Sequence, residues 1–405
     1  MMFDSVATLR DLVAIPSINP MGRTVIGPDF LEHRVTGYLE NLFARLAVPT
    51  VRQPIVPLRE NLIARLDGYP SPEQGGSVIL LEAHQDTVPV EGMIIPPFAA
   101  TVENGRLFGR GACDIKGGMT SMLAVMARLA AERANSREKQ LSSPTVFMAC
   151  TVNEEHGFTG ALGLCRLWET AEAIFPCKPH AAIVAEPTQL QVIVAHKGAV
   201  RWRLHTRGRS SHSSAPEKGA NAIFRMAKVL AALERYQKEM VGGLAEHPLC
   251  GKATLSVGTI TGGISVNTVP DRATIEIDRR LAPGEDPARA RQHVIDFIAQ
   301  ETGLAEHIEH AEPFTKHGGL NDARNGALAN QLVAAVRSLG IASQTCGVGF
   351  GTDAACYDAV GVPTVVFGPG SIEQAHTADE WISLAELDQA SEAVYRFISQ
   401  FQHAK

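Results

Sequence analysis

Apolar runs of strand length, each followed directly by acidic or histidine residues, constrain the fold of this 405-residue chain more than any other feature. The runs span residues 78–81, 146–152 and 181–185. Between the first two runs, residues 117–134 show the apolar period of a helix. Strands that alternate with helices indicate a largely parallel sheet with helices on both faces. We therefore expect an α/β fold class, with a three-layer domain whose polar side chains gather at the carboxyl ends of the strands.

The pattern changes near residue 192, which indicates a second domain. Segments typical of strands and helices follow one another over residues 199–207, 221–237, 254–261, 274–280 and 286–302. This order of strands and helices is typical of a small α+β, ferredoxin-like domain. Because 405 residues exceed one ordinary domain, we expect two. A discontinuous first domain would span residues 1–191 and 307–405, and an inserted domain would span residues 192–306.

The composition argues against several classes of protein. A formal charge of −6 is unfavourable for nucleic acid or an anionic membrane as the main partner. The N-terminal segment lacks the long apolar stretch of a signal peptide, and no apolar run approaches the ~20 residues that a membrane-spanning helix needs. The seven cysteines are scattered, without a Cys-x-x-Cys pair, which is typical of a reducing compartment. A cytoplasmic location is therefore expected.

His84 and Asp86 follow the first apolar run and are two residues apart, so on a strand they face the same side. A surface pair is the commoner explanation of this spacing, but a carboxylate beside a metal-binding imidazole would also orient that imidazole. Asp114 follows the glycine-rich turn 109–111. Its simplest interpretation is a helix N-cap, although the same position can present the carboxylate outward.

An adjacent acid pair, Glu154 and Glu155, directly follows the second apolar run. At the end of a buried strand, like charges this close destabilise each other unless a cation lies between them. Glu186 follows the third run, and His376 lies in the distant segment 370–376. Taken alone, Glu186 is explained as readily by a position without chemical function, and His376 is explained more readily by such a position.

Together these residues make a consistent metal site. His84, Asp114, Glu155, Glu186 and His376 supply two imidazoles and three carboxylates. Three carboxylates and one hydroxide would neutralise two divalent ions, and a neutral centre suits a partly dry site. Nitrogen and oxygen ligands without thiolate favour Zn²⁺, with Co²⁺ or Mn²⁺ as alternatives. The sequence therefore predicts two divalent metal ions, with Asp114 able to bridge them and one histidine at each.

Longer motifs around these residues occur in a fixed order along the chain. They are LVAIPSINP (12–20), HQDTVPV (84–90), GRGACDIKGG (109–118), NEEHG (153–157), AEPT (185–188), GRSSHSSAPEKGANAI (208–223), GGISVNTVPD (262–271) and FGPGSIEQAHTADEWI (367–382). In this order they resemble the M20 family of metallo-amidohydrolases and peptidases, over nearly the whole chain. Within the family, the resemblance is greatest to acetylornithine deacetylases, and succinyl-diaminopimelate desuccinylases are close behind.

The resemblance implies roles for the residues of the first domain, which would be catalytic and metal-binding. The five residues of the predicted metal site would be the ligands, with Asp114 bridging. Asp86 would support His84, and Glu154 would be the general base. The inserted domain would act as a lid and dimerisation domain, so that the protein would be a homodimer.

The resemblance also implies roles in substrate binding. His212 resembles a histidine that reaches the partner subunit's site and stabilises the oxyanion, although by itself it would be explained as a surface residue. Asn267 resembles a substrate-contacting asparagine, and Arg280 resembles the arginine that holds the substrate carboxylate. By the same resemblance, Gly351 and Thr352 would lie in a loop near the substrate. This loop differs from the Cys-Thr-Glu-Ala type of the deacetylases and from the Gly-Gly-Thr-Ser-Asp type of the desuccinylases.

The function implied is metal-dependent hydrolysis of the amide bond of an N-acyl amino acid, closest to the deacetylation of an N-acetyl-ornithine-like substrate. A desuccinylase, a dipeptidase and a carboxypeptidase on the same scaffold are alternatives within this class. A non-catalytic binding protein is the alternative from a different class, and the intact set of acids argues against it.

Overall fold

The structure is a computed structural model that describes residues 3–25, 27–135, 142–170, 175–244 and 246–402. The described residues form two compact units. The first comprises those of Met1–Val194, Asp322–Cys346 and Thr352–Lys405, and the second comprises those of Ala195–Asn321 and Gly347–Gly351. The boundaries expected from the sequence were 191/192 and 306/307. The second unit extends past residue 306 because β14 (Ile308–His310) and β15 (Thr315–His317) both pair with its strand β9 (Gly198–Arg207).

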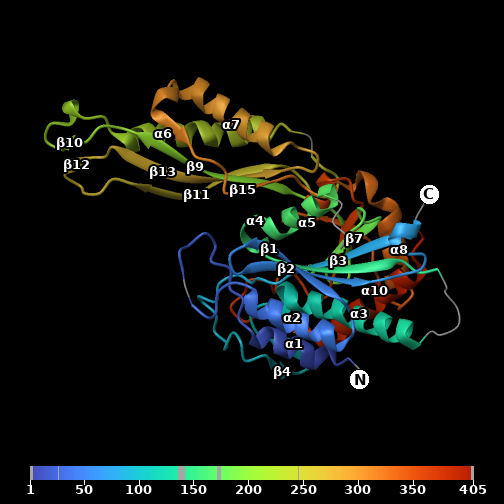
Figure 1. Cartoon of the computed structure of the whole chain (residues 1–405). Helices are drawn as coiled ribbons and strands as arrows, with labels where there is room; N and C mark the ends of the chain where they lie inside the picture. The colour runs from blue at the N-terminus through green and yellow to red at the C-terminus, as the bar shows by residue number, and fades with distance from the viewer. Residues whose placement is uncertain (1–2, 26, 136–141, 171–174, 245, 403–405) are drawn as a thin grey trace. The chain divides into compact units, whose positions relative to one another are not determined.

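A mixed sheet forms the centre of the first unit, with eight strands among the described residues (Figure 1). In spatial order they are β1 (Thr50–Val56), β2 (Arg59–Leu66), β6 (Thr145–Thr151), β3 (Val78–His84), β7 (Ala181–Val184), β17 (Thr364–Val366), β8 (Val192–His196) and β16 (Thr345–Val348). The strands from β6 to β17 are parallel, and the pairs β1–β2, β2–β6 and β17–β8 are antiparallel. The expected α/β class with a largely parallel central sheet is confirmed.

Helices cover both faces of this sheet. They are α1 (Ser5–Ala14), α2 (His33–Arg45), α3 (Gly117–Asn135), α4 (Glu154–Gly157), α5 (Thr159–Thr170), α8 (Gly326–Arg337), α9 (Ala354–Ala359) and α10 (Leu384–Gln400). Helices α2, α3, α8 and α10 share one hydrophobic core with the sheet, whereas α5 and α9 contact strands from the other side. A small separate sheet contains β18 (Trp381–Ser383), β5 (Arg106–Phe108) and β4 (Thr101–Glu103). No helix among the described residues is long and apolar enough to cross a membrane.

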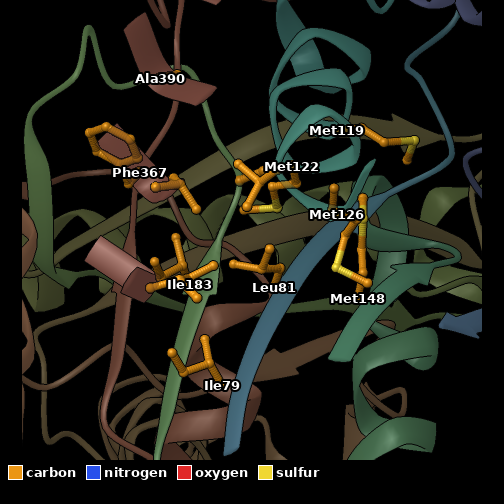
Figure 2. Packing of buried hydrophobic residues seen from close by; sticks show 14 of the residues in the cluster. Ile79, Leu81, Met119, Met122, Met126, Met148, Ile183, Phe367 and Ala390 are labelled. Carbon is orange, nitrogen blue, oxygen red and sulfur yellow. The ribbon is translucent and has the colours of Figure 1, made fainter. Parts of the chain in front are cut away.

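The central strands are buried on both faces, which explains their unbroken apolar sequences. Alternate residues of β3, Ile79 and Leu81, belong to the core that the sheet shares with α3, and Leu81 points toward Met122 of that helix (Figure 2). Truncation of Leu81 to alanine would cost about 2–5 kcal/mol, since the side chain is fully buried. The strands that carry the polar edge residues are therefore among the best-anchored parts of the unit.

The second unit contains an antiparallel sheet in the order β11 (Thr254–Gly262), β13 (Arg272–Leu281), β9 and β14, with β15 also paired to β9. Helices α6 (Ala222–Arg235) and α7 (Pro287–Thr302) pack against one another and against β9 and β13. Trp202 and Ile275 lie in the core that results. The order strand, helix, strand, strand, helix, strand agrees with the expected ferredoxin-like α+β pattern. A short two-stranded ribbon, β10 (Ser211–His212) with β12 (Thr268–Val269), belongs to the same unit.

Candidate metal centre

Three neighbouring parallel strands deliver four of the predicted residues to one edge of the central sheet. His84 ends β3 and pairs with Thr151 at the end of β6. Glu154 and Glu155 follow β6 and begin the short helix α4, and Glu186 is the second residue after β7. Because these strands are parallel, their carboxyl ends meet at the same edge.

Asp114 and His376 reach this edge from loops. Asp114 lies in the turn Ala112–Lys116 before α3, with backbone angles outside the helical region. Its Oδ1 lies 3.2 Å from Nε2 of His84, and its Oδ2 lies 3.2 Å from Nε2 of His376. The two oxygen atoms of one carboxylate therefore face two different imidazoles. His376 has a φ of 61°, which is uncommon outside glycine and recurs at functional sites.

Two groups of potential ligands share Asp114. One group is His84, Asp114 and Glu186, and the other is Asp114, Glu155 and His376; within each group the ligand atoms lie within 4.8 Å of one another. Two ligands on a tetrahedral Zn²⁺ with ordinary bond lengths are separated by about 3.3 Å. The separations between Asp114 and the two histidines are close to this value. The structure thus brings together all five residues predicted as ligands.

The hydrogen bond at the other nitrogen of His84 prepares it for metal binding. Nδ1 lies 2.9 Å from the backbone carbonyl oxygen of Asp86. A carbonyl oxygen can only accept, so Nδ1 carries a proton. Burial opposes the charged form of His84, but hydrogen bonds with Asp114 and Asp86 raise its pKa well above the ordinary value, so Nε2 donates to Asp114 and would become a ligand atom on loss of that proton. This is the arrangement of a histidine ligand held by an outer hydrogen bond.

Several carboxylates lie close together in the cluster, and their mutual repulsion favours a bound cation. Burial raises the pKa of Glu155 to about 7, and repulsion from Asp114 adds to the shift. Burial, with repulsion from Asp114, also raises the pKa of Glu186 well above its ordinary value. Burial opposes the charged form of His376, but hydrogen bonds with Asp114 and Glu155 raise its pKa to about 11. Oε1 of Glu155 is buried without a hydrogen-bond partner among the described residues.

Asp86 contacts the residues that follow β6. Its Oδ1 accepts a hydrogen bond from the backbone N–H of Glu154, and its Oδ2 accepts one from the backbone N–H of Glu155, each at 3.2 Å. Oδ2 also accepts from Nδ2 of Asn19 at 2.7 Å. The carboxylate lies 3.6 Å from Nδ1 of His84. Asp86 therefore holds the acid pair as well as facing the histidine, a link that the sequence motif alone did not indicate.

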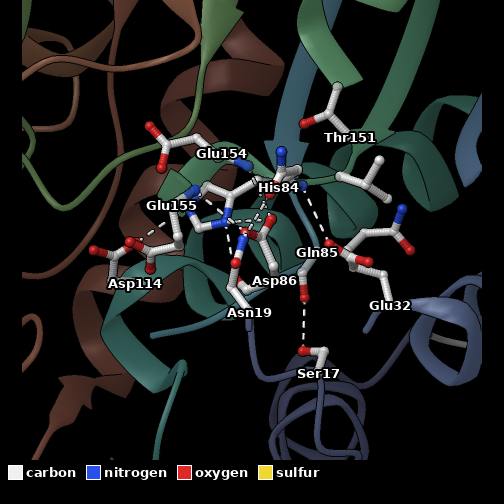
Figure 3. A network of polar contacts seen from close by, with 12 residues as sticks. Ser17, Asn19, Glu32, His84, Gln85, Asp86, Asp114, Thr151, Glu154 and Glu155 are labelled. Carbon is white, nitrogen blue, oxygen red and sulfur yellow. Dashed lines mark hydrogen bonds and ion pairs between the residues drawn. The ribbon is translucent and has the colours of Figure 1, made fainter. Parts of the chain in front are cut away.

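Glu154 is buried beside the ligand cluster, and burial raises its pKa well above the ordinary value. Its carboxylate extends away from the neighbouring carboxylates of Glu155 and Asp114 (Figure 3). Glu154 belongs to neither group of potential ligands. A buried carboxylate beside a polar centre, with a raised pKa, is suited to accept and return a proton at neutral pH.

A buried ion pair stabilises the backbone at the start of α4. Arg59 donates hydrogen bonds to both carboxylate oxygens of Glu32 and to Oδ1 of Asn153. Oε1 of Glu32 accepts the backbone N–H of Asn153 at 3.1 Å. Asn153 adopts a φ of 65°, a conformation that asparagine tolerates better than most residues. No sequence motif pointed to Arg59 or Glu32, because residues on separate elements form this network.

The residues predicted to contact substrate fall into separate groups, and His212 and Asn267 form the first of these. His212 pairs with Thr268 in the ribbon β10–β12, and the backbone N–H of Ser213 donates to the carbonyl oxygen of Asn267. His212 and Asn267 are therefore close neighbours in the second unit. The side chain of His212 is exposed, and its Nδ1 lies 2.7 Å from Oγ of Ser214.

Arg280 lies near the other end of the second unit's sheet, where it pairs with Ala199 of β9. Its Nε donates to Asp278 at 3.2 Å. Gly351 belongs to the same unit, and a Cβ atom there would lie 2.6 Å from Cε1 of His317, so a larger residue would have to displace that ring. Thr352 belongs to the first unit, where its buried hydroxyl accepts the N–H of Ala354 at 3.2 Å.

The sequence was also compared with protein-family models and with known proteins, and the matches indicate the same family that the motifs suggested. The model of peptidase family M20/M25/M40 matches residues 80–400. An acetylornithine deacetylase of Myxococcus xanthus is 33% identical over 344 residues, which cover 84% of each protein. The chain belongs to peptidase family M20/M25/M40.

Proteins described by other names are also similar. A probable carboxypeptidase of Aspergillus niger is 30% identical over 409 residues, covering 94% of this chain and 86% of the relative. The solved structure of the YXEP protein of Bacillus subtilis, described as a dinuclear metal binding peptidase from the M20 family, has a TM-score of 0.68. It is 18% identical and covers 97% of this chain and 96% of its own, so it supports the fold.

Proposed function

We propose that this M20 protein is a metal-dependent hydrolase that cleaves the amide bond of an N-acyl amino acid, with an N-acetyl-ornithine-like substrate as the first candidate. The observation that carries the proposal is the carboxylate of Asp114, whose two oxygens face His84 and His376 at equal distances. Such an arrangement suits a ligand shared by two ions. The similarity to an acetylornithine deacetylase supports the choice of substrate.

The two groups that share Asp114 would each hold one divalent ion, with His84 and Glu186 at one and Glu155 and His376 at the other. Zn²⁺ is the proposed ion, and Co²⁺ and Mn²⁺ would bind the same nitrogen and oxygen atoms. When bound, the ions would polarise the scissile carbonyl and acidify the attacking water. A Bacillus subtilis relative described as dinuclear supports two ions.

Glu154 would take the proton of the attacking water and return it to the leaving amine. Its raised pKa favours both halves of this exchange near neutral pH. Asp86 would keep Glu154 and Glu155 in place through their backbone N–H groups. His212 would stabilise the oxyanion, and Asn267 would contact the substrate.

Arg280 would bind the substrate carboxylate, with Gly351 and Thr352 in the adjoining loop. Arg280 and the ribbon that carries His212 lie toward opposite ends of β13, since Arg272 marks the end near the ribbon. Eight residues of strand span about 26 Å. One small substrate could contact both side chains only if they came from different subunits, which supports a homodimer.

Exposed apolar side chains in the second unit also support a homodimer. Phe224 on α6 is 70% exposed, and Ile264 and Val266, just before Asn267, are 93% and 100% exposed. Side chains of this kind commonly mark an interface between proteins. A cytoplasmic location remains a prediction from the cysteines, none of which forms a disulfide among the described residues.

A panel of substrates tests the proposal. Purified protein loaded with Zn²⁺, Co²⁺ or Mn²⁺ would be assayed with N-acetyl-ornithine, N-succinyl-diaminopimelate and a set of dipeptides and N-acyl glutamates. The proposed substrate should give the highest kcat/KM. Preference for dipeptides or for C-terminal residues would favour a peptidase, in line with the carboxypeptidase relative. Purified protein without metal, and without hydrolysis after metal is added, would favour a binding protein.

A further inference from the structure

Glu380 places its carboxylate against the turn that carries Asp114, although 266 residues separate the two in sequence. Oε1 accepts the backbone N–H groups of Cys113 at 2.8 Å and Asp114 at 3.0 Å. Oε2 accepts the N–H of Gly111 at 3.0 Å and Nη1 of Arg110 at 2.7 Å. The side chain is fully buried. Four donors therefore converge on one carboxylate that is not itself a candidate ligand.

The turn depends on an anion at this position. Gly111 has a φ of 82°, and Asp114 and Ile115 depart from helical angles, so the N–H groups of the turn point to one side instead of along a helix. Successive N–H groups arranged in this way form a concave anion site. Without the carboxylate, buried donors of Gly111, Cys113 and Asp114 would lose their partner.

The same residue is tied to the segment that carries His376. Glu380 follows His376 by four residues, and its backbone carbonyl accepts the N–H of Gly109 at 2.9 Å. Its side chain and its main chain thus both bind the glycine-rich turn. Through these bonds, Glu380 joins the shared candidate ligand to a ligand that belongs to only one of the two groups.

The two groups differ in how firmly the protein holds them. His84 and Glu186 extend from buried central strands, and 2% and 4% of these residues are exposed. The side chain of His376 is 50% exposed and comes from a loop. Loss of Glu380 should therefore disturb the group of Asp114, Glu155 and His376 more than the group on the strands.

We propose that Glu380 is a positioning residue that fixes the Asp114 turn against the His376 segment. It thereby sets the metal affinity of the group formed by Asp114, Glu155 and His376, which we call the His376 site and expect to be the weaker of the two. The inference rests on the proposed metal centre. It assigns Glu380 no contact with substrate or with an ion.

The test is metal binding by Glu380→Gln. The amide keeps the shape of the side chain but replaces one acceptor oxygen with a donor that faces N–H groups. Stepwise Zn²⁺ affinities would be measured by competition with a chelating dye, and the environment of each site by the visible absorption of bound Co²⁺. The weaker site, that of His376, should lose affinity for Zn²⁺ by about 10–100-fold, the usual effect of removing a residue that hydrogen-bonds to a metal ligand. The tighter site should change by less than about threefold, and added metal should restore kcat.

Glu386→Gln is the matched control, because the Glu386 carboxylate also accepts a backbone N–H in this region, that of Gly370 at 2.8 Å. It should leave both affinities near those of the wild type. If Glu380→Gln does not fold, Arg110→Lys serves as the second variant, since it loosens the same carboxylate while keeping the charge. The weaker site should then lose less affinity than expected for Glu380→Gln, but still measurably.

Equal losses at both sites, or an unchanged weaker site in whichever variant folds, would overturn the role of Glu380. Wild-type protein that binds fewer than two ions would overturn the proposed metal centre and this inference together. Wild-type protein that binds two ions but hydrolyses none of the substrate panel would overturn only the proposed activity, and the affinities of the variants would still decide the role of Glu380.

Discussion

Asp86 Oδ1 accepts the backbone N–H of Glu154 at 3.2 Å, which ties the strand that carries one candidate ligand to the residue proposed to move protons. The neighbouring N–H of Glu155 donates to the other oxygen of the same carboxylate. One buried side chain therefore contacts both the candidate metal centre and the residue proposed as general base. A histidine-orienting role alone would leave these two hydrogen bonds unexplained.

Replacement of Asp86 by asparagine should reduce kcat by about 10–100-fold, because one acceptor oxygen becomes a donor that faces an N–H group. KM should change less, since Asp86 is buried behind the site. Steady-state kinetics with saturating Zn²⁺ would measure the effect. Asp388→Asn, on the exposed side of α10, is the control and should behave as wild type. A kcat within twofold of wild type would contradict the positioning role of Asp86.

Glu154→Ala should lower kcat by about 10²–10⁴-fold while leaving two ions bound, since the carboxylate lies outside both ligand groups. Metal content by elemental analysis and single-turnover rates would be measured on the same preparation. Glu155→Ala is the contrasting variant, because it should lose metal as well as activity. A Glu154→Ala protein with nearly normal turnover would exclude the residue as general base.

Asp114→Asn should reduce the occupancy of both metal sites, because Asp114 is the one candidate ligand common to the two groups. Glu186→Gln should weaken one site and leave the other close to wild type. Stepwise Zn²⁺ titration followed by calorimetry would separate these patterns. Loss of a single ion in Asp114→Asn would mean that the carboxylate does not bridge.

The parts of this site that could be predicted from sequence are those encoded by local patterns. The apolar runs before His84, Glu154 and Glu186 indicated parallel strands, and parallel strands bring their carboxyl ends together. The charge count and the family motifs then indicated the remaining ligands. Each of these inferences uses residues that lie within a few positions of one another or match a fixed motif.

The supporting contacts could not be predicted in this way. Glu380 meets the Asp114 turn, and Glu32 meets Arg59, across long stretches of sequence and between separate elements. The sequence alone does not show whether a glutamate is buried or exposed, because burial depends on how the elements pack in the fold. The end of the second unit escaped prediction for a similar reason, because the short strand β15 is recognisable only by its pairing with β9.

Replacement of Arg59 by methionine should destabilise the protein by about 3–5 kcal/mol, because it leaves the buried Glu32 carboxylate without its cation. The double variant Glu32→Gln/Arg59→Met should recover much of the loss. Urea unfolding of the apoprotein, followed by tryptophan fluorescence, would measure both. Equal destabilisation in the single and double variants would show that the effect comes from lost packing rather than from an unpaired charge.

Buried neutral histidines in the second unit should make its stability depend on pH. Burial lowers the pKa of His317 to about 4, and the nearby Arg201 and Arg280 add to the shift. Burial likewise lowers the pKa of His196 to about 3. An unfolded histidine has a pKa of about 6.5, so between pH 6.5 and 4 the unfolded chain binds more protons than the folded one. The stability is therefore present above pH 6.5 and is lost as the pH falls.

For each of these histidines the loss between pH 7.5 and 5.5 is about 1 kcal/mol. His317→Gln removes one such group, so the free energy of unfolding should decrease over this range by about 1 kcal/mol less than in wild type. Urea unfolding at the two pH values would measure the difference, with the half-buried His307→Gln as the control. The comparison concerns only the change with pH, so a general loss of stability in the variant does not affect it. An identical pH dependence in wild type and His317→Gln would mean that His317 accepts a proton as readily in the folded protein as in the unfolded chain.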